Sequence, residues 1–186
     1  KAKKITEDYA AEILKSQAER SLYKTNSCVL MTEAYTQFCN EFPFDETPDQ
    51  LRASAEIAKD LCEEKPMERL LCADVSFGKT EVAMRACFQV VTNHYQVVVL
   101  VPTTILAKQH YQNFTKRFDS HQIKLACIDG STSKKEKNTI IDAYNNQSIH
   151  ILVGTHSILS IANINATIGL IIVDEEHRFG VKQKEK

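Results

Sequence analysis

Short apolar runs alternate with longer stretches of helical periodicity over the carboxyl-terminal two thirds of the chain. The runs predict strands at 69–73, 96–101, 123–128, 149–153 and 168–173. The stretches between them predict helices at 79–92, 104–118 and 133–146, and a short one near 156–160. Strands that are apolar at nearly every position are typical of a parallel sheet covered by helices on both faces. We therefore expect an α/β fold, with a doubly wound, mostly parallel sheet of five or six strands between residue 66 and about residue 181.

The first 62 residues show helical patterns instead. One apolar stripe predicts a helix over 4–23; it is made of Ile5, Tyr9, Ile13, Ala18 and Leu22. A second helix is predicted over 31–40. Thr47 followed by Pro48 is typical of a helix start, with the Thr as N-cap and the Pro at the first helical position. This start predicts a third helix, from 48 to about 62.

The numbers of charged residues, cysteines and histidines argue against an overall basic surface, a disulfide framework and a metal site. The chain has 23 Lys and Arg against 24 Asp and Glu, a net charge of −1, so any nucleic-acid contact must come from local groups. The six cysteines form no Cys-x-x-Cys pair and several lie in apolar runs, so we expect small buried thiols rather than disulfides or zinc ligands. The spacing of His94, His110, His121 and His150 is also unlike that of metal ligands, and we expect surface or packing roles for them.

The chain shows no membrane-directed segment. Its longest apolar runs are far too short to cross a bilayer, and its basic, then polar, start is unlike a signal peptide. We expect a cytoplasmic protein with no membrane partner. The chain begins without Met and ends in the charged run 182–186, so we also expect it to be a piece of a longer protein.

A candidate phosphate-binding loop lies between the first predicted strand and the helix at 79–92. Its residues are Ala73, Asp74, Val75, Ser76, Phe77, Gly78, Lys79 and Thr80. In this setting, backbone N–H groups and the positive end of the helix converge on a phosphate. Lys79 is long enough to reach the β- and γ-oxygens, and Thr80 offers a hydroxyl to Mg²⁺. Gly78 lets the backbone pass close to the phosphate.

Two positions of this loop depart from the strict pattern. Ala73 stands where the strict form has Gly, a difference that we discount. Ser76 stands where related loops usually carry Gly. If the backbone at Ser76 needs a positive φ, the side chain costs about 1 kcal/mol, which would weaken nucleotide binding without abolishing it.

An acidic cluster follows the last predicted strand. The strand runs into Asp174, Glu175, Glu176 and His177. Carboxylates at the carboxyl end of a parallel strand face the ligand crevice. Asp174 is placed to hold Mg²⁺ through water, and Glu175 to orient or deprotonate an attacking water. The alternative is that these residues form an ordinary solvated loop. The candidate phosphate loop makes this alternative less favoured, because the chain between Lys79 and Asp174 is long enough for three crossovers, which could bring the cluster back to the sheet edge near that loop.

Together these motifs resemble the first RecA-like domain of the superfamily-two helicases. The form Asp-Glu-Glu-His-Arg-Phe-Gly-Val at 174–181, the segment 77–85 and the segment 101–111 narrow the resemblance to the bacterial transcription-repair coupling factors, with the RecG-like fork-remodelling helicases as runner-up. The resemblance implies a RecA-like P-loop fold over 42–186. It also implies that 1–41 are linker helices that join a polymerase-binding domain to the motor.

The resemblance assigns roles to further positions. Phe44, Thr47 and Gln50 stand where these motors bind adenine, although Gln50 by itself would be an ordinary exposed helix residue. His177 stands where the family links the nucleotide site to the loops that face DNA. Contacts to the DNA backbone are implied for Thr103, Thr104, Gly154, Thr155 and His156, for whose threonines helix capping is an equal alternative. Around 128–132 the family's Arg-bearing segment is missing, which leaves a DNA contact there open.

The resemblance also implies cofactors, partners and a limit on activity. ATP and Mg²⁺ are the expected cofactors, and double-stranded DNA is the expected partner; RNA polymerase and excision-repair proteins would bind through other domains. The expected function is a DNA translocase that displaces stalled RNA polymerase and recruits repair. Without the second motor domain and its arginines, we expect this piece to bind nucleotide weakly and to hydrolyse little or none. A degenerate, non-hydrolysing P-loop scaffold is the alternative from another class.

Overall fold

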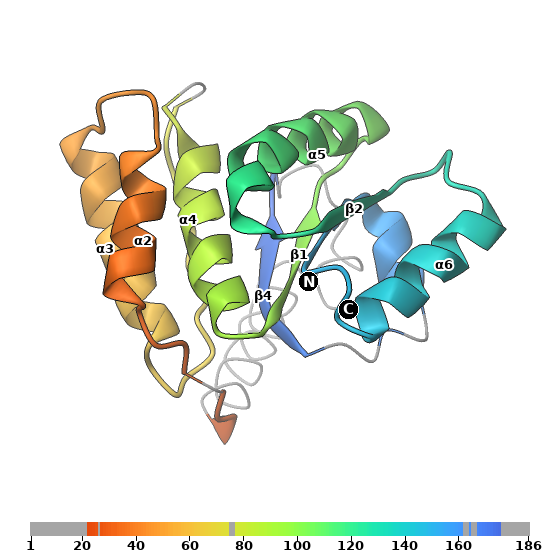
Figure 1. Ribbon diagram of the computed structural model, residues 1–186, viewed down its shortest axis with the longest axis horizontal. Coiled ribbons are helices and arrows are strands. Elements are labelled where there is room, and N and C mark those ends of the chain that lie inside the picture. The colour runs from red at the N-terminus through yellow and green to blue at the C-terminus, as the bar shows by residue number, and fades with distance from the viewer. Residues whose placement is uncertain (1–21, 26, 75–76, 162–163, 165–166, 176–186) are drawn as a thin grey trace, which may run out of the picture.

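A computed structural model describes residues 22–25, 27–74, 77–161, 164 and 167–175. A parallel sheet of four strands forms the centre of this part of the chain (Figure 1). The strands are β1 (Gln96–Leu100), β2 (Leu125–Ile128), β3 (Ile151–Gly154) and β4 (Ile168–Val173), in the order β2-β3-β1-β4. Val98 of β1 pairs with Leu152 on one side and with Ile171 on the other. Because every pairing is parallel, all four strands end at one edge of the sheet.

The helices begin and end close to the predicted positions. They are α2 (Thr32–Asn40), α3 (Pro48–Leu61), α4 (Lys79–Thr92), α5 (Thr104–Phe118) and α6 (Lys134–Asn145), with short 3₁₀ turns at Asp119–His121 and His156–Ser160. The predicted start of α3 is confirmed: the Thr47 hydroxyl accepts from the backbone N–H of Gln50, whose side chain accepts in return from the Thr47 N–H. The helix predicted over 4–23 lies outside the described residues, apart from its last two positions.

Two apolar cores form on the two faces of the sheet. On one face, Val97 and Val99 of β1 pack with the buried sides of α4 and α5. On the other face, Val98 and Leu100 pack with Ile141 and other residues of α6 and of the turn after β3. Figure 1 shows α2 and α3 side by side next to α4 at one end of the molecule and α6 at the other end. The doubly wound α/β prediction is therefore confirmed.

The prediction of a strand at 69–73 is wrong, and the sheet of the described residues has four strands rather than five or six. Arg69 is held against α3 instead, where its guanidinium bonds the carboxylates of Glu56 and Asp60. The Leu70 side chain is 74% exposed. Cys72 is exposed as well, contrary to the expectation of a buried thiol, whereas Cys28 and Cys87 are buried; all six cysteines are free.

One aromatic side chain fixes α2 against the rest of the fold. Phe38 of α2 is fully buried, and its ring stacks on Phe88 of α4 at a centroid distance of 4.3 Å and on Phe118 of α5 at 5.3 Å. The guanidinium carbon of Arg117 lies 3.7 Å from the centroid of the same ring. These contacts join α2 to the packed layer formed by α4 and α5 on that face of the sheet.

No helix among the described residues combines the length and the apolar character needed to cross a membrane.

Candidate nucleotide site

The helix α4 begins where the predicted phosphate loop ends. Gly78 is its N-cap and has a φ of 72°, a conformation that glycine adopts without the steric cost of a side chain. A Cβ at this position would lie 2.1 Å from Nε2 of Gln50, so a larger residue would clash as well as strain the backbone. The Lys79 ammonium donates to the carbonyl oxygens of Ala73 and Asp74, the latter at 3.2 Å. The Lys79 side chain therefore reaches back to the two described residues at the start of the predicted loop.

Two predicted loop residues, Val75 and Ser76, lie outside the described residues. The expected effect of Ser76 on nucleotide binding therefore stays a prediction. Thr80 occupies the second position of α4 and is half-buried, one residue after Lys79.

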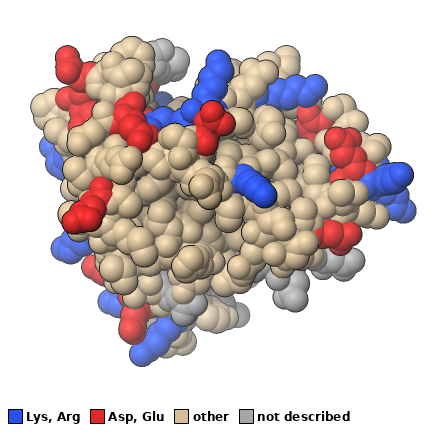
Figure 2. All heavy atoms as spheres, in the orientation of Figure 1, with Lys and Arg blue, Asp and Glu red and all other residues tan. Residues whose placement is uncertain are grey.

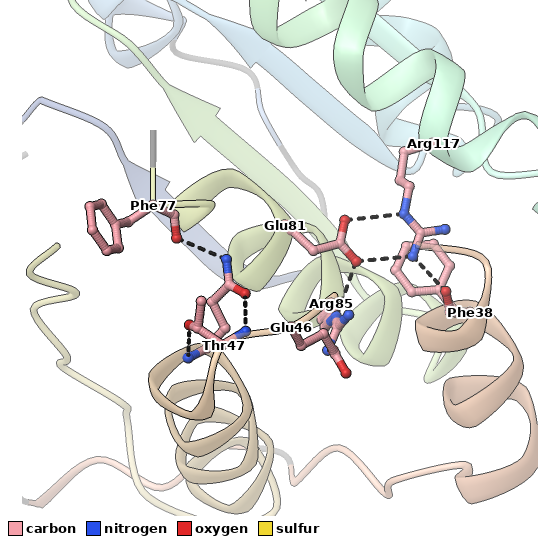
Figure 3. A network of polar contacts seen from close by, with 8 residues as sticks. Phe38, Glu46, Thr47, Phe77, Glu81, Arg85 and Arg117 are labelled. Atoms are coloured by element: carbon pink, nitrogen blue, oxygen red, sulfur yellow. Dashed lines mark hydrogen bonds and ion pairs between the residues drawn. The ribbon is translucent and has the colours of Figure 1, made fainter. Parts of the chain in front are cut away.

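The side chain of Gln50 connects the start of α3 to this loop. Its Oε1 accepts from the Thr47 N–H at 2.8 Å, and its Nε2 donates to the Phe77 carbonyl oxygen at 2.9 Å (Figure 3). Phe44 and Phe77 are exposed, with 71% and 57% of their surface accessible, and they offer apolar rings near the same segment. The residues predicted to bind adenine and phosphate thus come from two elements that contact each other.

Replacing Gln50 by Ala should lower the free energy of unfolding by about 1–2 kcal/mol, because the change removes half of the capping box and the contact to Phe77. Urea denaturation measures the loss. Gln50→Glu is the matched comparison, since a carboxylate still accepts from the Thr47 N–H but cannot donate to the Phe77 carbonyl. An unchanged stability in Gln50→Ala would contradict the structural role of this link.

The acidic cluster starts where β4 ends. The Asp174 N–H continues the ladder by donating to the Leu100 carbonyl at 2.9 Å. Its Oδ1 accepts from the Glu175 N–H at 2.9 Å, and its Oδ2 lies 2.8 Å from Nε2 of His110. Glu175 is half-buried and has a positive φ of 50°. Glu176 and His177, which were predicted to belong to the cluster, lie outside the described residues.

The groups around Asp174 lower the pKa of its carboxyl. The hydrogen bond from His110 is the largest influence that holds the pKa of Asp174 below its ordinary value, and it outweighs the opposing effect of burial. The charges of His110 and Lys79 and the bond from the Glu175 N–H act in the same direction. A carboxylate that stays negative at neutral pH, with each oxygen bonded once, fits the donor set that Mg²⁺ requires.

The phosphate-loop lysine and the acidic cluster meet at one edge of the sheet. Asp174 follows the end of β4, so it lies at the carboxyl edge. A connection of three residues joins the end of α4 to β1, which places the start of α4, at Lys79, at that same edge. The influence of Lys79 on the pKa of Asp174 agrees with this placement. Ligands of open α/β sheets bind in the crevice outside the carboxyl ends of the strands.

The loops predicted to contact DNA end at this edge too. Thr103 caps α5 by accepting from the Leu106 N–H at 3.2 Å, and Thr104 is the first residue of that helix. After β3, Thr155 is buried with its hydroxyl 3.0 Å from that of Ser157, while His156 is exposed. Helix capping is therefore what the Thr103 hydroxyl does in this structure, and DNA contact by these five residues stays a prediction.

A residue larger than glycine does not fit at position 154. A Cβ at this position would lie 2.0 Å from the Ile128 carbonyl oxygen of the neighbouring strand.

A compact turn follows β2, where the family's Arg-bearing segment is missing. In this turn, buried Asp129 accepts from the Ser131 N–H at 2.7 Å. The hydrogen bond from the Ser131 hydroxyl is the main cause that lowers the pKa of Asp129.

On the face drawn in Figure 2, acidic and basic side chains are interspersed, in agreement with the net charge of −1.

A buried ionic network lies one turn into α4. Arg85 bonds Glu81, at 3.0 Å, and Glu46, and Arg117 of α5 bonds both oxygens of Glu81 at 3.0 and 3.1 Å. Arg117 also donates to the Phe38 carbonyl (Figure 3). The network therefore ties α2, α5 and the segment before α3 to the helix that carries Lys79.

Sequence reasoning missed two of these groups. His110 was expected to have a surface or packing role, and the structure instead bonds it to Asp174. No spacing rule connects residues 64 positions apart, so the only signal was that both follow strands of one predicted parallel sheet. The pair Glu81–Arg85 resembles an ordinary surface pair, but it lies in a helix that is apolar on nearly every side, which was a signal of burial.

Comparison with known proteins identifies the family of the chain. The family model of the DEAD/DEAH box helicases matches residues 47–186. The transcription-repair-coupling factor of Escherichia coli is 46% identical over the whole chain, which spans 16% of that relative's length. A chloroplastic ATP-dependent DNA helicase of Arabidopsis thaliana is 48% identical over 80% of the chain and 18% of its own length.

One solved structure extends the comparison to three dimensions. The structure of RecG bound to a three-way DNA junction superposes with a TM-score of 0.82 at 36% identity, over 89% of this chain and 23% of that one. The RecA-like fold expected from the motifs is therefore confirmed, and so is the narrower resemblance. The chain belongs to the DEAD/DEAH box helicase family, as a helicase ATPase domain homologous to the transcription-repair coupling factors.

Proposed function

We propose that the chain is the ATP-binding half of a double-stranded DNA translocase that displaces stalled RNA polymerase at lesions and couples transcription to nucleotide excision repair. The observation that carries the proposal is the meeting of the Lys79 helix start and the Asp174–Glu175 pair at one sheet edge. The homology to the transcription-repair coupling factors supports this choice of function, and RNA polymerase and repair proteins are the partners that we propose. Since the chain spans 16% of the Escherichia coli relative, the polymerase and repair contacts would lie in parts of the protein outside these residues.

Each phosphate-binding group has a defined task. The free N–H groups at the start of α4 and the helix dipole attract the β-phosphate. The Lys79 ammonium would leave the Ala73 and Asp74 carbonyls and bind the β- and γ-oxygens. Thr80 and Asp174 would hold Mg²⁺, which when bound offsets the negative charge of the phosphates. Glu175 would orient or deprotonate the attacking water, and His177 would link the site to the DNA-facing loops.

The adenine would bind beside the start of α3. Gln50 keeps one amide hydrogen and one carbonyl lone pair beyond its contacts with Thr47 and Phe77, and the adenine edge needs one donor and one acceptor. The exposed Phe44 ring offers a surface on which a base can stack. DNA would lie across the ends of β1 and β3, where backbone N–H groups and hydroxyls at 103–104 and 154–156 bind phosphates without reading sequence.

The chain by itself should hydrolyse ATP little or not at all. The arginines that complete such sites come from a second motor domain, and they are worth orders of magnitude in rate. Translocation also needs two domains that open and close around the nucleotide.

Calorimetric titration with ATP or ADP in the presence of Mg²⁺ tests the proposal. We expect the chain to bind nucleotide and expect Lys79→Ala to weaken binding by about 100-fold or more, because a charge-assisted contact to phosphate is lost. Lys108→Ala, an exposed lysine of α5, is the matched control and should bind like the unchanged chain. Absence of binding in every variant would favour the degenerate scaffold instead.

Fork remodelling of the RecG kind is the second candidate. The superposition on RecG at a three-way junction favours it, although the identity of 36% is lower than the 46% shared with the Escherichia coli coupling factor. Displacement of a stalled polymerase and regression of a model fork, both assayed with a protein that contains this chain, would separate the two functions.

A further inference from the structure

The carboxylate of Asp174 is oriented by a side chain from a different layer of the fold. Asp174 stands at the end of β4, whereas His110 lies in α5, 64 residues earlier in the chain. The ring nitrogen Nε2 and the carboxylate Oδ2 are 2.8 Å apart. Because an ionised carboxylate only accepts, Nε2 must be the donor in this bond.

The imidazole itself has little freedom to move. The His110 side chain is only 14% exposed, and its ring packs beside Phe114, one turn further along α5, with ring centroids 6.0 Å apart. Phe114 is fully buried in the core below. Among the described residues, the other ring nitrogen, Nδ1, is buried with no hydrogen-bond partner. The bond to Asp174 is therefore the polar contact that the structure shows for this ring.

The two hydrogen bonds to Asp174 leave part of its carboxylate free to accept further contacts. The His110 N–H takes one lone pair of Oδ2, and the Glu175 N–H takes one lone pair of Oδ1. One lone pair remains on each oxygen, and with one donor held on each oxygen the carboxylate cannot rotate freely. A carboxylate fixed in this way loses less conformational entropy when it binds a cation or its water ligand.

We propose that His110 is a positioning residue for Asp174, which holds the carboxylate in the orientation that receives the Mg²⁺ of the bound nucleotide. The proposal rests on the proposed function, because it needs a nucleotide site at this edge. It deepens that function by adding a residue from α5, the helix whose first turn lies at the loop we propose for DNA contact.

Three variants test the proposal. His110→Phe keeps a ring that packs on Phe114 and removes the donor, while His110→Gln places an amide N–H close to where Nε2 was. Asp174→Asn sets the upper limit of the effect. Each is titrated with ADP in EDTA and then, at saturating ADP, with Mg²⁺, and each is melted thermally to compare folding.

We expect His110→Phe to raise the Mg²⁺ concentration needed for half-saturation by about 10-fold, the usual scale for a residue that orients a metal ligand. ADP binding in EDTA should stay within about twofold in all variants, and His110→Gln should recover most of the Mg²⁺ affinity. An unchanged Mg²⁺ requirement in His110→Phe would overturn the proposal. So would an equal loss of ADP binding in EDTA and with Mg²⁺, which is the behaviour of a residue that only supports folding.

Two further outcomes are also decisive. If His110→Phe does not fold, His110→Asn replaces it, because its shorter amide cannot reach Asp174 from the same helix position; the same Mg²⁺ criterion applies. If the unchanged chain binds no ADP in either condition, the proposed function fails, whereas ADP binding with a Mg²⁺ requirement that His110 does not affect removes only the positioning role.

Discussion

Replacing Arg85 by Ala is expected to lower the free energy of unfolding by about 3–5 kcal/mol. The Arg85 side chain is 4% exposed and bonds the carboxylates of Glu81 and Glu46, so its removal takes away the cation that the structure shows for Glu46 and leaves Glu81 with Arg117 alone. A single domain is stable by about 5–15 kcal/mol, so this one change removes a large part of the total. Urea denaturation followed by far-ultraviolet circular dichroism measures the loss.

Arg52→Ala is the control for this prediction. Arg52 bonds Asp49 at 2.8 Å, but the two side chains are 72% and 82% exposed, and an exposed pair contributes about 0–1 kcal/mol. Arg85→Met separates charge from volume, because its side chain fills a similar space and still leaves Glu46 and Glu81 short of one partner. Equal losses in Arg85→Ala and Arg52→Ala would show that the network does not stabilise the fold.

The network has consequences beyond stability because of where it lies. Glu81 follows the proposed metal ligand Thr80 by one residue, and Glu46 precedes the N-cap of α3 by one residue. Phe38 and Arg117 extend the same network to α2 and α5. A disturbance of this network therefore reaches both segments that we propose for nucleotide binding, and loss of nucleotide affinity should accompany loss of stability in Arg85→Ala.

Local patterns predicted the helices and most strands of this fold well. The continuous apolar run that starts at Val97 forms most of β1, since burial on both faces favours apolar side chains at nearly every position; Gln96 is the one polar residue of this strand. The pair Thr47–Pro48 begins a helix for two reasons. The Thr47 hydroxyl accepts from a backbone N–H of the first turn, and Pro48 lacks the N–H that would have no partner at the first helical position. These elements depend on neighbours in sequence, so the sequence alone is enough to place them.

Contacts between distant segments were harder to predict. The run at 69–73 has the composition of a strand, but ion pairs from Arg69 hold it against α3 and away from the sheet. The pattern of the run itself does not show whether these ion pairs or the pairing with the sheet is more stable. The bond from His110 to Asp174 joins two elements whose relative position appears only when the sheet order is known. The buried pair Glu81–Arg85 likewise depends on Arg117 of another helix.

Replacing Glu175 by Gln is expected to lower the rate of ATP hydrolysis by about 10²–10⁴-fold while nucleotide binding is retained. The amide has the shape of the carboxylate but cannot accept a proton from water. Because the chain alone should hydrolyse little, the measurement needs a complete motor. A suitable one is a chimaera in which this chain replaces the matching segment, 16% of the length, of the Escherichia coli coupling factor.

The backbone of Glu175 is strained. Its φ of 50° lies in the left-handed region, which costs a residue with a side chain about 1 kcal/mol relative to glycine. His94, Gln122 and Gln147 adopt the same conformation in turns, so the strain does not by itself mark a reactive site; it shows that the surrounding structure fixes this residue. Here Glu175 is fixed by its bond to Asp174, the carboxylate beside which the phosphates would bind.

The control for this experiment is Glu136→Gln, on the exposed first turn of α6, which should leave hydrolysis unchanged. A hydrolysis rate in Glu175→Gln within about threefold of the unchanged chimaera would remove Glu175 as the base, since a residue that takes a proton in the transition state contributes far more. A loss of nucleotide binding together with hydrolysis would instead assign Glu175 to holding the nucleotide. Lys79→Ala should lose binding first and Glu175→Gln should lose only the chemical step, and this contrast distinguishes a working motor half from a scaffold that merely retains the fold.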